Sequence, residues 1–165
     1  MNSYGFRERA AAGRQHELAE AALSQEWPDI FEFRWEREGN DMDRRGVDLQ
    51  VTRYDGHAHT VEIKYNDWPH GHDIRVEWWS VEEQQRLGWS VDPDKLTEWL
   101  LNLWPDGFHS LLPFAPFREI VSRNREQYRR DYGERRTSTE GRYHTVFTPV
   151  PVDRLRRDMT TRVVA

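Results

Sequence analysis

The sequence contains no cysteine, and this absence narrows the chemistry open to the chain. Disulfide frameworks and thiolate metal sites both need cysteine and are therefore excluded. No stretch approaches the roughly 18 consecutive apolar residues that a membrane-spanning helix requires. The N-terminal residues Met1 to Glu8 lack the apolar core of a signal peptide. We therefore expect a cytoplasmic protein without a membrane segment.

Lysine is almost absent as well. Among the 24 basic residues only Lys64 and Lys95 are lysines, and all others are arginine. We attribute this bias to the coding sequence of the source rather than to the fold. A lysine kept in such a background indicates a position that needs a compact ammonium group instead of a planar guanidinium, for example to orient a water molecule.

The net charge of −5 conceals an asymmetry between two parts of the chain. The C-terminal segment, residues 118–165, holds twelve arginines against seven acidic residues, whereas the first 117 residues carry a balance of −10. A basic segment beside an acidic body can place a cationic face near a cleft lined by carboxylates. The same composition also suits a solvated helix, so both interpretations remain open.

The length of 165 residues suits a single domain, residues 1–165. Small residues at helical spacing predict a first helix over about residues 7–25, and alternation of apolar and polar residues predicts a strand over 30–35. Further strands are expected over 47–52, 60–65, 74–79, 110–112 and 143–147. Residues 98–103 show no clean period and could form a helix or a strand, and we favour a strand that forms a second hairpin with 110–112. Helices are expected over 115–131 and 152–159, and residues 133–141 read as a polar loop. This order predicts an α/β fold around one central mixed sheet flanked by helices.

The strands expected over 47–52 and 60–65 form a hairpin across the Asp55-Gly56 turn. Side chains two residues apart on a strand share a face, so Glu62 and Lys64 project together. If the pairing brings Asp48 beside Glu62, two carboxylates and one ammonium group gather, and the backbone carbonyl of Ile63 can turn toward them. Such oxygen ligands suit Mg²⁺ or Mn²⁺, and Lys64 would orient the attacking water.

The tripeptide Gly46-Val47-Asp48, followed after a spacer by Val61-Glu62-Ile63-Lys64, resembles the core of the PD-(D/E)XK nuclease superfamily. The shared core of that superfamily is an N-terminal helix, a hairpin bearing the Asp and the E-x-K, and flanking helices. The resemblance covers roughly residues 7–79. Val47 stands where the family usually has proline, and many members of the family also lack that proline.

The resemblance implies a metal-dependent endonuclease that hydrolyses DNA. Asp48 and Glu62 would bind Mg²⁺ or Mn²⁺ and Lys64 would position the water. In the resolvase branch a helix also offers a glutamate, and Glu17 is the best match for it. Glu17 lies four residues from both Gly13 and Ala21, which the spacing places on the inner face of the helix, so its carboxylate is expected on or beside that face, toward the sheet. Arginines of the C-terminal segment would contact phosphates, and a homodimer is left open, since many relatives act as one. The candidate phosphate contacts are Arg129, Arg130, Arg135 and Arg136.

Several alternatives stand beside the nuclease. The chain could be a catalytically inactive DNA-binding module or an acidic protein that imitates DNA, and Glu62 and Lys64 could merely decorate the wet face of a sheet. Glu77 could be a further ligand or part of a cross-strand ion pair. A zinc site among His57, His59, His70 and His72 is disfavoured without cysteine. The tryptophans could stack on bases or line a carbohydrate cleft, although a glycosidase leaves Lys64 without a role.

Overall fold

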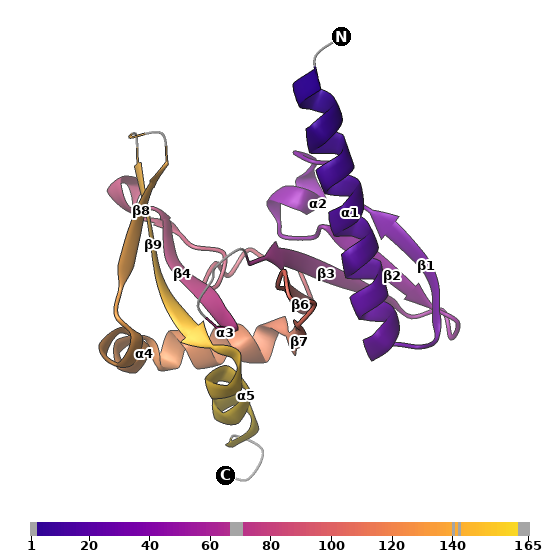
Figure 1. Ribbon diagram of the computed structural model, residues 1–165. Coiled ribbons are helices and arrows are strands. Elements are labelled where there is room, and N and C mark those ends of the chain that lie inside the picture. The colour runs from indigo at the N-terminus through magenta and orange to yellow at the C-terminus, as the bar shows by residue number, and fades with distance from the viewer. Residues whose placement is uncertain (1–2, 67–70, 140, 142, 162–165) are drawn as a thin grey trace.

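The computed structural model (Figure 1) describes residues 3–66, 71–139, 141 and 143–161. Its helical elements are α1 (Ser3–Glu26), α2 (Asp41–Arg44), the 3-10 turn η1 (Glu82–Gln84), α3 (Phe114–Arg123), α4 (Arg125–Tyr132) and α5 (Val152–Thr160). Its strands are β1 (Ile30–Trp35), β2 (Leu49–Arg53), β3 (Ala58–Tyr65), β4 (Asp73–Val81), β5 (Arg86–Leu87), β6 (Trp99–Leu103), β7 (His109–Pro113), β8 (Arg135–Thr139) and β9 (Tyr143–Pro151).

The larger sheet is mixed and has the strand order β1-β2-β3-β6-β7. Strands β1, β2 and β3 form an antiparallel meander, β3 pairs in parallel with β6, and β7 returns antiparallel to β6. The predicted hairpin is thus the β2–β3 pair, and β3 is an interior strand of this sheet. An α/β domain with a mixed sheet flanked by helices is confirmed.

The expectation of one sheet is wrong, because four strands form a second, antiparallel sheet in the order β5-β4-β9-β8. Parallel strands need a long crossover connection, and β4 and β5 lie within the crossover from β3 to β6. Strand β4 pairs with β9 from the far end of the chain, a partnership that local alternation cannot indicate. The predicted polar loop over residues 133–141 contains β8, the outer strand of this second sheet.

Two apolar cores lie on opposite faces of β6. Leu101 and Leu103 join the core beneath α1, whereas Leu100 joins the core between the mixed sheet, α3, α5 and the second sheet. Helix α1 approaches its core closely because Ala19 and Ala22 are small and buried. In Figure 1, α1 with β1 to β3 lies on one side of β6, and β4, β8 and β9 lie on the other.

The helix expected over residues 115–131 is divided into α3 and α4 at Asn124, which ends the first helix and begins the second. Phe117 of α3 and Tyr128 of α4 both pack into the second core. Among the described residues, no helix is long and apolar enough to span a membrane.

Leu101 offers a test of the first core. Its side chain is fully buried in an interior strand, so Leu101→Ala should lower the free energy of unfolding by about 2–5 kcal/mol through lost burial and a residual cavity. Leu96→Ala removes the same atoms from an exposed position and serves as the matched control, with an expected change below about 0.5 kcal/mol. Urea denaturation measures both. Equal effects of the two substitutions would contradict the described core.

Candidate functional site

Asp48 is held at the point where β2 begins. Leu49 lies opposite Val61 in the antiparallel ladder, and the N–H of Asp48 extends the ladder by donating to the carbonyl of Val61 at 3.0 Å. The paired register begins at Leu49, and this hydrogen bond sets Asp48 beside Val61, next to Glu62 in sequence. The Oδ2 atom of Asp48 accepts a hydrogen bond of 2.6 Å from the N–H of Ile63, which fixes the carboxylate between the two strands.

Glu62 lies on the opposite face of β3 from Val61 and Ile63, which pack into the core under α1. Only 2% of the Glu62 side chain is exposed. Its Oε1 atom lies 2.6 Å from Lys64 Nζ. Its Oε2 atom is buried and has no hydrogen-bond partner in the described part of the chain. A buried carboxylate oxygen without a partner is costly, so this atom is a natural ligand for a cation.

Lys95 also reaches this carboxylate, with Nζ 4.0 Å from Glu62 Oε1. The two lysines of the chain therefore meet at one glutamate. The segment that carries Lys95 is fixed beside the hairpin by a hydrogen bond from the N–H of Leu96 to the carbonyl of Arg45. Lys95 was not predicted from the sequence, although the rarity of lysine that drew attention to Lys64 applies to it equally.

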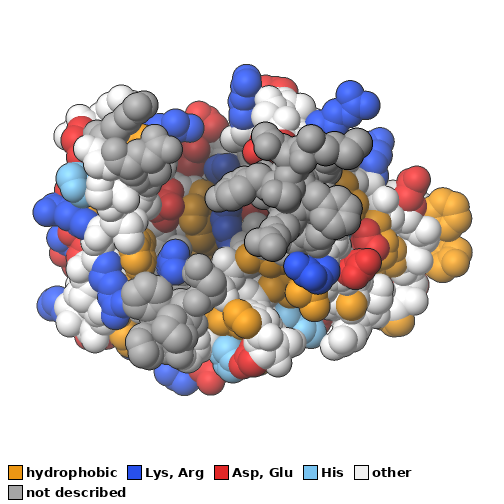
Figure 2. Space-filling model, turned by 45° about the horizontal axis from the view of Figure 1, so that its top comes forward, with side chains coloured by type: hydrophobic (Ala, Val, Ile, Leu, Met, Phe, Trp, Pro, Cys, Tyr) orange, Lys and Arg blue, Asp and Glu red, His pale blue; other side chains and the backbone are white. Residues whose placement is uncertain are grey.

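Glu77 enters the same site from the second sheet. It lines a pocket of about 220 Å³ that opens between the two sheets, together with Lys64, Trp89 and Asn102. The ammonium of Lys64 lies 5.0 Å from the centre of the Trp89 ring. Gly88 packs directly against the backbone of Glu77. A Cβ atom at position 88 would lie 2.2 Å from the carbonyl oxygen of Glu77, so this contact requires glycine. Figure 2 shows a hollow in the surface of the molecule, with both basic and acidic side chains in and around it.

Two carboxyl groups of the site, those of Asp48 and Glu77, have pKa values above their ordinary range. Burial raises the pKa of Asp48, although the hydrogen bond from Ile63 and the charge of Lys64 oppose it. Burial likewise raises the pKa of Glu77, against the charge of Lys64. Burial alone would lower the pKa of Lys64, but the adjacent Glu62, with Asp48 and Glu77, outweighs it and raises that pKa. These carboxylates therefore favour the protonated form of Lys64, which lies beside Glu62 as a hydrogen-bond donor.

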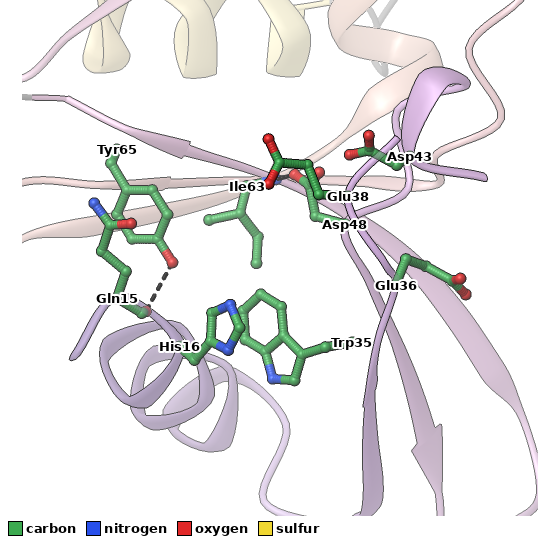
Figure 3. Close-up of a pocket in the computed structure, with 9 residues that line it drawn as sticks. All are labelled: Gln15, His16, Trp35, Glu36, Glu38, Asp43, Asp48, Ile63 and Tyr65. Atoms are coloured by element: carbon green, nitrogen blue, oxygen red, sulfur yellow. Dashed lines mark hydrogen bonds between the residues drawn. The ribbon is translucent and has the colours of Figure 1, made fainter. Parts of the chain in front are cut away.

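A second pocket, of about 220 Å³, lies between α1 and the start of β2 (Figure 3). His16 stacks on Trp35 at 3.6 Å, and the Tyr65 hydroxyl donates to the carbonyl of Gln15 at 2.7 Å. Figure 3 shows acidic side chains gathered on one side of this pocket. The acidic residues that line it are Glu36, Glu38, Asp43 and Asp48. Asp48 thus faces a strongly acidic pocket, where a cation is favoured over an anion.

Glu17 does not join these residues, and its predicted placement toward the sheet is wrong. Its side chain is exposed, whereas Ala19 and Leu23 are buried. A helix advances about 100° per residue, so Glu17 lies on the far side of α1 from Ala19. Gln15 and His16 are the residues of α1 that line the pocket containing Asp48.

The predicted phosphate contacts lie on α4 and β8 rather than beside Asp48. Arg129 is paired with Glu126 and Glu134, and Arg136 with Glu82. Arg130 is exposed. Arg135 lies opposite Phe147 of β9, which in turn lies opposite Glu77, so Arg135 shares a row of the second sheet with the site.

The histidines named in the zinc hypothesis are dispersed among separate carboxylates. His57 is paired with Asp55, His59 with Glu98 and His72 with Asp106. His70 lies outside the described residues. Within the ranges that the structure describes, no three histidine, aspartate or glutamate side chains are grouped closely enough to hold a metal by themselves.

A cation at this site would need ligands beyond side chains. Asp48 and Glu62 would supply carboxylate oxygens to such a cation, and the backbone carbonyl of Ile63 remains a predicted third ligand. Mg²⁺ commonly binds through one or two carboxylates and keeps several waters, so a pair of acidic residues is sufficient for it. The buried Oε2 atom of Glu62 is compatible with this assignment.

Comparison of the chain with protein-family models, curated proteins and solved structures finds no match in any of the three.

The raised pKa of Asp48 predicts that its charge destabilises the metal-free fold. Because the folded pKa exceeds the ordinary value of 3.8, stability is greatest when Asp48 is protonated and falls as the pH rises through the folded pKa. Asp48→Asn keeps an oxygen that can accept from Ile63 and removes the charge. In excess chelator it should therefore unfold at higher urea concentration than wild type near pH 7.

The difference between Asp48→Asn and wild type should shrink as the pH falls and disappear below 3.8, where Asp48 is protonated in both the folded and the unfolded state. Asp43→Asn, at an acidic residue of the same pocket, serves as a control for general charge removal. If Asp48→Asn is less stable than wild type at neutral pH, the described placement of the Asp48 carboxylate is contradicted.

Proposed function

We propose that this protein is a divalent-metal-dependent nuclease that hydrolyses phosphodiester bonds in DNA. The observation that carries the proposal is the environment of Glu62. A carboxylate with 2% exposure, one unpartnered oxygen and two converging lysines is an expensive arrangement for a fold that needs only stability. Such arrangements are concentrated at functional sites.

The connectivity around Glu62 supports the same proposal. The N-terminal helix α1 is followed by a meander in which Asp48 precedes β2 while Glu62 and Lys64 belong to β3. This order is the one implied by the resemblance to the PD-(D/E)XK superfamily. The restriction endonuclease-like classification of the mixed sheet belongs to the proposal as well.

Each residue receives a role from its chemistry. Asp48 and Glu62 would hold Mg²⁺ or Mn²⁺, with the Ile63 carbonyl as a further ligand. The bound ion would lower the pKa of a water molecule and neutralise charge on the scissile phosphate. Lys64, whose Nζ lies 2.6 Å from Glu62 Oε1, would donate a hydrogen bond to the attacking water and fix its position.

The burial of Glu62 argues against the idea that Glu62 and Lys64 merely decorate a wet sheet face. Exposed ion pairs contribute roughly 0–1 kcal/mol and leave both groups in water. Here the carboxylate is withdrawn from water, and the charges of Asp48 and Glu77 also act on Lys64. A solvent-exposed pair would not explain this concentration of charge.

DNA is the proposed substrate because basic groups accompany the acidic ones in the hollow between the two sheets (Figure 2). Lys64 and Arg75 line the pocket there and bring positive charge to it, as contact with phosphates requires. The exposed ion pair of Arg136 with Glu82 is weak enough to exchange for a phosphate, and Arg129, Arg130 and Arg135 would extend that contact. An inactive DNA-binding module is the second candidate and shares this surface.

Lys64→Arg separates catalysis from charge alone. The planar guanidinium keeps the charge but cannot occupy the same point beside Glu62. A displacement of about 1 Å can cost on the order of 100-fold in rate. We therefore expect Lys64→Arg to fold and bind DNA as wild type does and to cleave roughly 100-fold more slowly. Cleavage is measured on linear, supercoiled and four-way-junction DNA with Mg²⁺ or Mn²⁺.

DNA affinity is measured with Ca²⁺, so that cleavage does not interfere, and excess chelator should abolish wild-type cleavage. The matched control is Arg45→Lys, the reverse exchange between arginine and lysine at an exposed position. This variant should cleave normally. Cleavage by Lys64→Arg within about threefold of wild type would remove the positioning role. DNA binding without metal-dependent cleavage by wild type would favour the inactive module.

A further inference from the structure

Lys95 has an unusual relation to Glu62. Its ammonium lies 4.0 Å from Oε1, beyond hydrogen-bond distance, while Lys64 Nζ lies 2.6 Å from the same oxygen. The Lys95 side chain is 14% exposed, so its charge is largely withdrawn from water without a close partner at the carboxylate. Lys95 is thus near enough to neutralise Glu62 but is not bound tightly to it.

Gly46 provides the space for this arrangement. A Cβ atom at position 46 would lie 2.6 Å from Cδ and 3.1 Å from Nζ of Lys95, and 2.8 Å from Oε2 of Glu62. The lysine stem therefore occupies the volume that any other side chain would take. Gly46 also has a φ of +80°, which glycine adopts without strain. The Lys95 ammonium and the unpartnered oxygen of Glu62 flank this one point.

The choice of lysine distinguishes Lys95 from the structural ion pairs of the chain, most of which use arginine. Arg53 binds Asp29 at 2.7 Å and Arg154 binds Asp158 at 2.9 Å, both with hydrogen-bonded geometry. Arginine binds carboxylates through a rigid fork, whereas lysine is a point charge on a flexible stem. A counter-ion that must leave its carboxylate is better made from lysine than from arginine.

We propose that Lys95 is a displaceable counter-ion, which neutralises Glu62 in the metal-free protein and withdraws when a divalent cation binds there. The inference rests on the proposed metal site at Glu62. Three carboxylates, those of Asp48, Glu62 and Glu77, face two ammonium groups in this cluster, and a buried carboxylate without counter-charge is strongly unfavourable. Lys64 stays in place because it is hydrogen-bonded to Glu62 and packed over Trp89.

Displacement makes Lys95 a competitor of the metal, so it sets the metal affinity of the site. Lys95→Met removes the charge and keeps an unbranched apolar side chain of similar length. Repulsion between a divalent cation and an ammonium a few ångströms away corresponds to about tenfold in affinity even at the dielectric constant of water. We therefore expect Lys95→Met to bind Mn²⁺ about tenfold more tightly than wild type, measured from the free Mn²⁺ signal in electron paramagnetic resonance.

Two controls separate this effect from general charge. Lys95→Arg keeps the cation and should show no gain in Mn²⁺ affinity. Arg157→Met removes a positive charge from an exposed position of α5 and should bind Mn²⁺ as wild type does. An equal gain in Arg157→Met would show that net charge, rather than displacement of Lys95, controls affinity, and would overturn the inference.

The scarcity of lysine permits a second measurement on the unmodified chain. An amine-acylating reagent followed by mass spectrometry reports on Lys64 and Lys95 separately, since the sequence has no other lysine. Saturating Mn²⁺ should increase the acylation rate of Lys95 several-fold and leave Lys64 protected. This readout does not depend on whether Lys95→Met folds.

The outcomes distinguish the two proposals. If wild type binds Mn²⁺ while Lys95→Met binds it no more tightly and the acylation of Lys95 is unchanged, Lys95 is a fixed structural cation and the inference is wrong, whereas the metal site stands. If neither wild type nor Lys95→Met binds Mn²⁺ at millimolar concentrations, the metal site itself fails, and the displacement of Lys95 fails with it.

Discussion

A buried carboxylate must be given counter-charge, and in this protein that constraint acts at Glu62. An isolated ionised carboxylate in an apolar interior would cost many kcal/mol, so the fold brings cations to it. Lys64 comes from the same strand, and Lys95 comes from the crossover that joins β3 to β6. The backbone contact between Leu96 and Arg45 and the absence of a side chain at Gly46 both allow Lys95 to reach the carboxylate. Several features distant in sequence are thus arranged around one charge.

The two apolar cores supply the stability that this polar centre does not. Strand β6, which pairs with β3, is interior to the sheet and contributes side chains to both cores. It is therefore anchored on both of its faces. Meanwhile the raised pKa values of Asp48 and Glu77 mean that ionisation of these groups at neutral pH works against folding. A divalent cation would reverse that effect, because it binds the ionised carboxylates of the folded state alone. Asp48, a proposed metal ligand, therefore opposes folding while it is ionised in the metal-free protein.

The hairpin could be predicted from the sequence because its signals are local. The Asp55-Gly56 turn and the alternation in β3 define the pairing of β2 with β3, and a hydrogen bond from the N–H of Asp48 to the carbonyl of Val61 sets Asp48 beside β3. The placement of Glu17 failed because Gly13 and Ala21, taken as inward-facing, are exposed, while Ala19 and Leu23 define the buried side. Small residues can lie on either side of a helix, so they mark a face poorly. The pairing of β4 with β9, and hence the second sheet, depends on residues more than 60 positions apart that carry no signal of each other. Lys95 was missed for a related reason, since it precedes β6 in a segment without regular structure.

The proposed function depends most on Glu62 acting as a metal ligand rather than as a structural anion. Glu62→Gln keeps the shape of the side chain and removes the charge, so its effect on metal binding is the most direct test. Isothermal titration with Mn²⁺ should give binding to wild type and none to Glu62→Gln at concentrations that saturate wild type, with circular dichroism confirming that both are folded. Equal Mn²⁺ binding by the two proteins would contradict the central claim.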